Sequence, residues 1–209
     1  MRGRDLSLWS SLALPLLLAA SGGACGPHGG HGGSGPQLMV TFTAAPTATP
    51  GLALTAATMT LEHVQVIGNG PGPSHGGTDP SEDHVTFDLL GVGDTVTQTV
   101  PPGLYSRIEF NIDGCAMSGS WNGTPFAAML AKYEGARVDV RAATPIEVLP
   151  GDETAQLTVT VDPDLWFAAP SPLDEATVGT DGTITCNDQQ NDTAAKDLTA
   201  RLPGSFTLK

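Results

Sequence analysis

Basic side chains are scarce in this sequence, since nine Lys and Arg stand against 22 Asp and Glu. The resulting formal net charge of −13 repels phosphate backbones and anionic lipid headgroups. We therefore expect no nucleic-acid partner. Charged residues of either sign make up only 15% of the chain, so Thr, Ser, Asn and Gln must keep much of the surface solvated.

The common signatures of catalysis are also missing. The sequence contains no G-x-S-x-G elbow, no H-E-x-x-H zinc motif, no P-loop and no dinucleotide-binding fingerprint. The five histidines, at positions 28, 31, 63, 75 and 84, follow none of these spacings. We predict a non-catalytic protein without a cofactor. An enzyme in which a serine, His84 and an aspartate meet only in space is the more distant alternative.

The first 24 residues have the layout of an export signal. Arg2 and Arg4 precede an apolar run that is short for a spanning helix of about 20 residues, and small residues follow it. Because Cys25 comes next, the segment resembles a bacterial lipoprotein signal, whose cysteine is lipidated and becomes the mature N-terminus. Gly22 departs from that pattern, which usually has leucine there. We predict an exported, lipid-anchored protein of the cell envelope, at the outer membrane. Ordinary cleavage with Cys25 left free, or an uncleaved anchor, are the alternatives.

Cleavage before Cys25 leaves seven basic and 21 acidic residues, a net charge of −14. Residues 25–36 then form a Gly- and His-rich tether that reaches about 18 Å on average. His28 and His31 in the tether are weak candidates for metal ligands, because ordering a glycine chain around an ion costs conformational entropy. The rest of the chain, residues 37–209, is expected to be a single domain.

Cysteine is nearly absent from that domain, which contains only Cys115 and Cys186 and no C-x-x-C redox motif. In an oxidising compartment an even pair of cysteines favours a disulfide. Seventy residues separate the two, and closing a loop of that length stabilises a fold by about 4 kcal/mol. Two buried free thiols are the alternative.

The stretch from 104 to 113 alternates between apolar and polar residues, as a strand with one buried face requires. The pattern assigns Leu104, Ile108, Phe110 and Ile112 to the core, and it assigns Tyr105, Arg107, Glu109, Asn111 and Asp113 to the wet face. The preceding Pro102-Gly103 pair predicts a type II turn, in which the glycine has a positive φ. We expect this strand to be central in the sheet.

Alternation of the same kind recurs at regular spacing through the domain. The apolar residues change parity near Glu62 and His63, which predicts a β-bulge. Residues 118–124 are expected to form a loop, and residues 187–197 a polar loop or short helix. The apolar triplet at 165–167 is expected to cap the core, and a platform for a ligand is the alternative. Together these patterns predict an all-β, antiparallel β-sandwich of about eight or nine strands.

Two motifs carry a resemblance to a known family. The sequence V-T-F-D-L-L-G at 85–91 and P-P-G-L-Y-S-R-I-E-F at 101–110 resembles a family of bacterial exported lipoprotein domains of unknown function. The T-I-T-C-N-D strand and the S-F-T-L ending also fit. The resemblance implies a transthyretin-like (prealbumin-like) sandwich, related in architecture to immunoglobulin-like domains, and an envelope location. It brings no catalytic residues.

Loops are the expected working surface of this domain. Trp121, between small polar residues, is the first candidate for contacting a protein or glycan partner, although its ring could also fold back over the core. His75, in the Gly- and Pro-rich 68–83 loop, is the second. Acidic residues near His75 and His84, and others in the C-terminal loops, make calcium or metal binding the alternative function. The sequence assigns no definite metal ligands, so we predict a non-catalytic binding or structural module.

Overall fold

The computed structural model describes residues 35–69, 84–91, 93–135, 137–151 and 154–209. The predicted signal peptide, the lipid-attachment residue Cys25, most of the tether and His75 lie outside these residues. None of the helices in the described ranges is long and apolar enough to cross a membrane.

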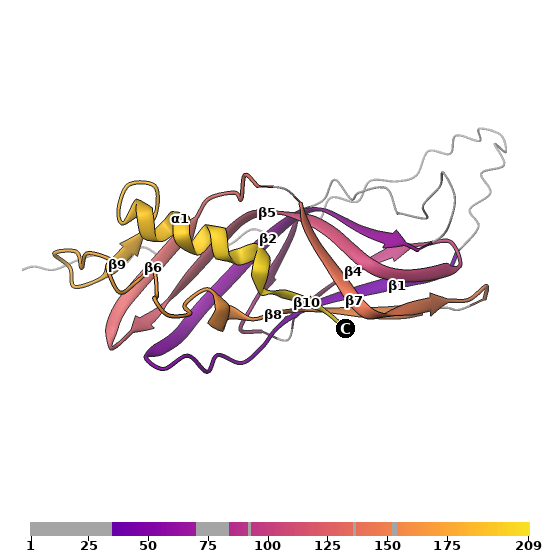
Figure 1. Ribbon diagram of the computed structural model, residues 1–209, viewed down its shortest axis with the longest axis horizontal. Coiled ribbons are helices and arrows are strands. Elements are labelled where there is room, and N and C mark those ends of the chain that lie inside the picture. Colours follow the sequence, from indigo (N-terminus) through magenta and orange to yellow (C-terminus); the bar gives the residue numbers. More distant parts are fainter. Residues whose placement is uncertain (1–34, 70–83, 92, 136, 152–153) are drawn as a thin grey trace, which may run out of the picture. The chain divides into compact units, whose positions relative to one another are not determined.

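Strands dominate the described residues (Figure 1). They are β1 (Gln37–Ala44), β2 (Leu52–Gly68), β3 (Val85–Asp88), β4 (Asp94–Thr99), β5 (Gly103–Trp121), β6 (Thr124–Leu130), β7 (Val138–Val148), β8 (Thr154–Val161), β9 (Ile184–Cys186) and β10 (Phe206–Leu208). The helical elements are α1 (Asp192–Arg201) and the short 3-10 turns η1 (Pro163–Leu165) and η2 (Leu202–Ser205). The helix α1 lies across β6 and β9, in agreement with the short helix that was one of two expectations for residues 187–197.

The ten strands form one sheet with the path β3-β2-β5-β7-β10-β8-β1-β4, and β6 and β9 extend it from β5. The two ends of the path contact each other through β3 and β4, so the sheet is curled, nearly closed and barrel-like. Three pairs, β1–β8, β7–β10 and β6–β9, are parallel. The predicted antiparallel β-sandwich is therefore wrong. Apolar alternation shows which residues form strands with one buried face, but it does not determine strand direction or whether a sheet curls.

The central strand is β5, as the alternation predicted, but its first residues are shifted in phase. Ile108, Phe110 and Ile112 are fully buried. Leu104, by contrast, is 47% exposed, and Tyr105 is buried in its place. A register shift between Tyr105 and Arg107 in the pairing with β7 causes the change. The expected type II turn is also wrong, because Gly103 belongs to β5 and is not among the described glycines with a positive φ.

Two short signals in the sequence determine local geometry. The parity change predicted a bulge near Glu62, and the structure confirms it: the pairing of β2 with β5 shifts between Glu62 and Gln65, and His63 has a φ of 53°. The expected loop at 118–124 is instead a tight hairpin between β5 and β6. Its turn residues, Asn122 and Gly123, have φ values of 49° and 83°. Asn-Gly is the strongest short hairpin signal, and it was available in the sequence.

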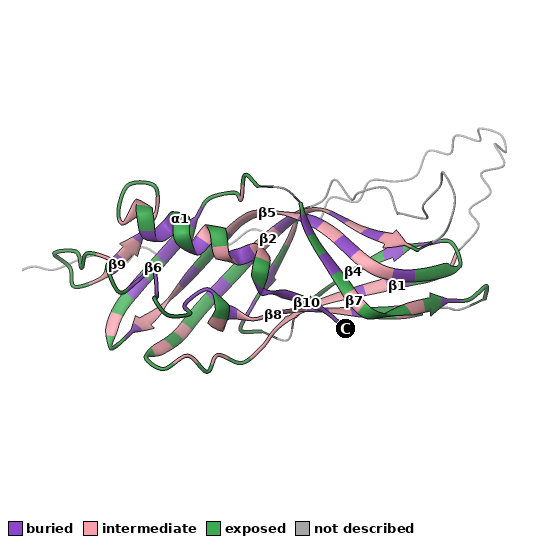
Figure 2. Ribbon diagram, in the orientation of Figure 1, coloured by how far each residue is buried: buried purple, intermediate pink, exposed green. Residues whose placement is uncertain are grey.

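Buried residues alternate with more exposed ones along the strands, which places the core on the inner side of the curled sheet (Figure 2). The apolar triplet after β8 is part of this core, since Trp166 and Phe167 are buried while Leu165 is 46% exposed. Arg201 at the end of α1 holds this segment in place. Its guanidinium donates hydrogen bonds to the carbonyl oxygens of residues 166, 168 and 170.

The predicted disulfide between Cys115 and Cys186 does not form, and both thiols are free and buried. Cys115 pairs with Leu130 on one side of β6, and Cys186 pairs with Ala128 on the other. Two strands with a third between them are about 10 Å apart, beyond the ~7 Å between Cα atoms that a disulfide can bridge. Compartment and residue count suggested the pairing, but the position of β6 prevents it.

We expect the mature protein with Cys25 replaced by serine to contain two thiols that react with Ellman's reagent only after unfolding. Burial raises the pKa of Cys115 to about 12 and that of Cys186 to about 11, so little thiolate forms near neutral pH. Dithiothreitol should leave the melting temperature unchanged. A melting temperature that falls by several degrees on reduction, or no reactive thiol after denaturation, would contradict the structure.

Candidate functional site

The outer face of β5 carries a dense group of charged side chains. Outward-pointing residues alternate along it from Arg107 through Glu109 to Asp113, which the sequence predicted as wet positions. Neighbouring strands add charged and polar side chains at matching register: Gln65 of β2 and Asp139 of β7 both lie opposite Glu109. Four of the nine Lys and Arg in the sequence gather here, at positions 107, 132, 137 and 141.

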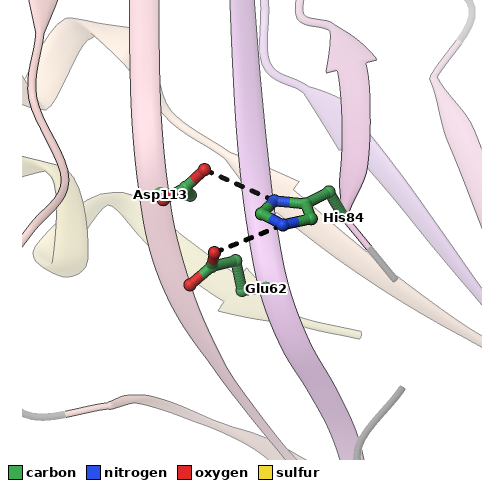
Figure 3. Close-up of side chains that lie close together, drawn as sticks. All are labelled: Glu62, His84 and Asp113. Atoms are coloured by element: carbon green, nitrogen blue, oxygen red, sulfur yellow. Dashed lines mark ion pairs between the residues drawn. The ribbon is translucent and has the colours of Figure 1, made fainter. Parts of the chain in front are cut away.

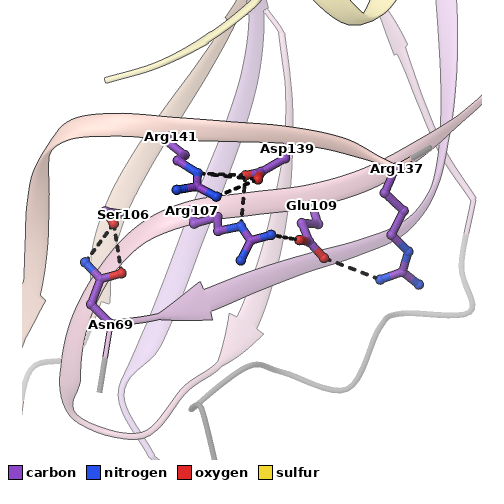
Figure 4. A network of polar contacts seen from close by, with 7 residues as sticks. All are labelled: Asn69, Ser106, Arg107, Glu109, Arg137, Asp139 and Arg141. Atoms are coloured by element: carbon purple, nitrogen blue, oxygen red, sulfur yellow. Dashed lines mark hydrogen bonds and ion pairs between the residues drawn. The ribbon is translucent and has the colours of Figure 1, made fainter. Parts of the chain in front are cut away.

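One half of this face is a set of ion pairs, which we call the arginine network: Arg107, Glu109, Arg137, Asp139 and Arg141 (Figure 4). Arg107 donates to Asp139 Oδ1 at 2.9 Å and also to Glu109. The guanidinium of Arg137 lies 3.8 Å from Glu109 Oε2, and that of Arg141 lies 3.0 Å from Asp139 Oδ2. Hydrogen bonds from Arg141 and Arg107 hold the pKa of Asp139 below its usual value, although burial opposes the shift. Three guanidinium groups against two carboxylates give the network a positive local charge.

A shallow hollow of about 520 Å³ opens beside the arginine network. It is lined by Gln65, Ile67, Gly68, Asn69, Arg107, Glu109 and Arg141. At its edge the amide of Asn69 exchanges two hydrogen bonds with the Ser106 hydroxyl, at 2.7 and 3.0 Å, which fixes the amide orientation (Figure 4). The hollow therefore offers guanidinium and amide donors together with carboxylate and amide acceptors.

The other half of the face is the carboxylate–histidine cluster: Glu62, His84 and Asp113 (Figure 3). One ligand atom from each residue lies within 4.8 Å of the others. His84 places Nε2 at 3.5 Å from Glu62 Oε1 and Nδ1 at 3.3 Å from Asp113 Oδ2. Lys132 also pairs with Glu62, and its Nζ lies 3.7 Å from Asp113 Oδ1. The hydrogen bond from Lys132 lowers the pKa of Glu62, and Glu62 in turn raises the pKa of Lys132.

Irregular strand pairing brings the two carboxylates of the cluster together. Thr60 pairs with Gly114 and Leu61 with Ile112, so Asp113 is an extra, bulged residue of β5. The predicted bulge follows directly after Glu62 on the neighbouring strand. Bulges re-aim side chains in this way. The sequence predicted one of these two bulges and named His84, but the acidic residues that precede His84 in the sequence, and that were its expected partners, lie outside the described residues.

Trp121, the first contact residue chosen from the sequence, is a core residue in the structure. Only 8% of it is exposed. Its ring stacks on Phe167 with centroids 6.1 Å apart, and its Nε1 donates to Asp174 Oδ1 at 3.0 Å. The alternative that its ring folds back over the core is therefore the correct one. His75, the second choice, remains a prediction because it lies outside the described residues.

Three of the C-terminal carboxylates proposed as a calcium supply, Asp164, Asp174 and Asp181, have structural roles. Asp164 accepts hydrogen bonds from the backbone N–H groups of residues 48 and 49. Burial alone would raise the pKa of Asp164, but these bonds outweigh burial and lower it. Asp174 accepts from Trp121 and from the Ser171 N–H, and Asp181 accepts from the Thr183 N–H. They are capping and bracing groups, and the cluster around His84 is the more convergent set of ligands in the described ranges.

Comparison with known proteins adds no relative. No family model matches the chain, and no curated protein or solved structure matches it significantly. The resemblance to bacterial exported lipoprotein domains therefore stays a prediction from the two sequence motifs.

Proposed function

We propose that this chain is a non-catalytic module of the cell envelope, anchored through lipid on Cys25, that binds a carboxylate-bearing glycan on the outer face of β5. The observation that carries the proposal is the hollow beside the arginine network. The lipid anchor rests on the sequence of residues 1–25 alone. The binding surface differs from the loops expected from the sequence, because Trp121 is in the core.

Rigidity favours binding at this hollow. Its charged side chains project from strands and are held by mutual ion pairs, so little side-chain entropy is lost when a ligand binds. Arg107 and Arg141 present planar donors that match a carboxylate, and the amides of Gln65 and Asn69 suit hydroxyl groups. The positive local charge is opposite in sign to that of the whole chain, which favours an acidic ligand at this place.

The chemistry of the lining favours a glycan over a protein. Protein interfaces usually have an apolar or aromatic centre that carries most of the binding energy. Ile67 is the one large apolar side chain in the lining of this hollow, and the remaining large side chains are polar or charged. A sugar can use such a surface, because its hydroxyl and carboxylate groups require hydrogen-bonding partners.

Other side chains agree with a non-catalytic role. His84 faces two carboxylates instead of a hydroxyl or thiol that it could activate as a nucleophile. The two thiols of the domain are buried, and their raised pKa values make them poor nucleophiles.

Arg141→Gln is expected to weaken binding of a uronic-acid oligosaccharide by about tenfold or more, as loss of a charge-assisted hydrogen bond does. The Arg141 side chain is 68% exposed, so the substitution should leave stability nearly unchanged. Lys196→Gln, at a 74% exposed position on α1, is the matched control. Binding would be measured by titration calorimetry after a glycan array has chosen the oligosaccharide. Equal affinity of Arg141→Gln and wild type, or no glycan bound by the wild type, would contradict the proposal.

A further inference from the structure

The carboxylate–histidine cluster brings three potential metal ligands together on one face of the sheet. Both ring nitrogens of His84 face carboxylate oxygens, at 3.5 Å and 3.3 Å. An imidazole nitrogen and carboxylate oxygens are all metal donors, and one such atom from each of the three residues lies within 4.8 Å of the others. A cation held between the ring and the two carboxylates would contact one donor atom from each residue.

The backbone supplies the three side chains from adjacent positions. Glu62 is on β2 and Asp113 is on β5, which pairs with β2. His84 directly precedes β3 and follows the register in which Val85 pairs with Leu61, so it lies beside Glu62. Each potential ligand therefore comes from a different segment of the same hydrogen-bonded sheet, and the bulge at Asp113 turns its carboxylate toward the other two (Figure 3).

We propose that Glu62, His84 and Asp113 bind a divalent transition-metal ion of the zinc class. One imidazole nitrogen and two carboxylate oxygens are donors that zinc accepts, and water can take the fourth tetrahedral position. Zinc–ligand bonds of about 2.0–2.2 Å require the donor atoms to draw somewhat closer than the 4.8 Å within which they now lie. His84 has the freedom to do so, because its side chain is 56% exposed.

The donor set argues against calcium and magnesium at this place. Calcium takes six to eight oxygen ligands and magnesium a near-ideal octahedron of oxygens. The cluster offers two carboxylates, and its third member is a nitrogen donor, which suits zinc, nickel and copper better.

Lys132 is the competitor of the metal ion. Its ammonium group pairs with both carboxylates, so it neutralises part of the charge that would attract a divalent cation. Its side chain is 43% exposed and can swing into solvent when a metal ion takes its place. Removing this positive charge should therefore tighten metal binding. In a purely structural ion-pair cluster, loss of Lys132 would create no such affinity.

The test is titration of the mature chain, with Cys25 replaced by serine, with zinc chloride in a non-coordinating buffer. We expect the wild type to bind one zinc ion at the carboxylate–histidine cluster. Its affinity should fall by about tenfold or more in His84→Ala and in Asp113→Asn, since each removes a ligand bond. Affinity should rise several-fold in Lys132→Met. Zinc should raise the melting temperature of the wild type and of Lys132→Met, and much less that of His84→Ala.

His63→Asn is the matched control, because it removes the neighbouring histidine and asparagine tolerates the positive φ at that position. The tether histidines are present in every variant and contribute the same background. Zinc binding that is equal in wild type, His84→Ala and Lys132→Met would place the ion elsewhere and overturn the proposal. A melting temperature raised by calcium and not by zinc would also overturn it. Neither result bears on glycan binding, which depends on Arg141.

Discussion

Replacing Phe110 by alanine is expected to lower the free energy of unfolding by about 3–5 kcal/mol, as removal of a buried aromatic ring does. The Phe110 ring is fully buried on the inner face of β5. It meets Phe42 of β1 edge-on with centroids 6.0 Å apart and Phe206 of β10 at 4.9 Å. The ring thus connects β5 to strands two and four places further along the sheet path, and the cavity left by alanine would have walls on several strands.

The matched control for Phe110→Ala is Leu104→Ala on the same strand. Leu104 is 47% exposed, so its truncation should cost less than about 1 kcal/mol. Both values can be measured by urea denaturation of the purified variants. The sequence pattern alone assigned both residues to the core and would predict large losses at both positions. Equal losses would therefore show that the phase shift at the start of β5 is wrong.

Periodicity identified the strands of this protein but not their arrangement. The alternation at Ile108, Phe110 and Ile112 correctly marked the buried face of β5, because burial on one side of a strand imposes a period of two. The parallel pairing of β1 with β8 leaves no such mark in either strand. Sheet order depends on contacts between residues far apart in the sequence, and these are invisible in a local pattern.

The candidate sites were harder to predict than the strands, for a physical reason. Arg107, Glu109 and Asp113 were correctly assigned to the wet face of β5, but their partners come from β2, β7 and the segment before β3. Only strand register brings those partners near. Asp113 in addition reaches His84 through a bulge, which the sequence marks by a change of parity from Ile112 to Cys115 and which was not interpreted as one. The Asn-Gly turn was likewise a local signal and could have been read from the sequence.

Trp121→Ala is expected to destabilise the protein by about 3–5 kcal/mol. Only 8% of Trp121 is exposed, and its ring packs against Phe167. Its removal would also leave the carboxylate of Asp174 without the indole N–H donor, although the Ser171 N–H would still bond to it. A ring that served only as an exposed contact for a partner would cost less than about 1 kcal/mol on truncation.

Trp121→Phe separates the two contributions of this side chain. Phenylalanine keeps most of the packing against Phe167 but cannot donate to Asp174, so we expect a loss of about 1–3 kcal/mol, between wild type and Trp121→Ala. Asn122→Asp, at the adjacent exposed turn position, should change stability little, since aspartate also tolerates a positive φ. If Trp121→Ala melted like the wild type, the indole would not be part of the core.

Trp121 lies outside the lining of the hollow beside the arginine network. Trp121→Phe should therefore bind the same oligosaccharide as the wild type, and its loss of stability should appear only in the melting curve.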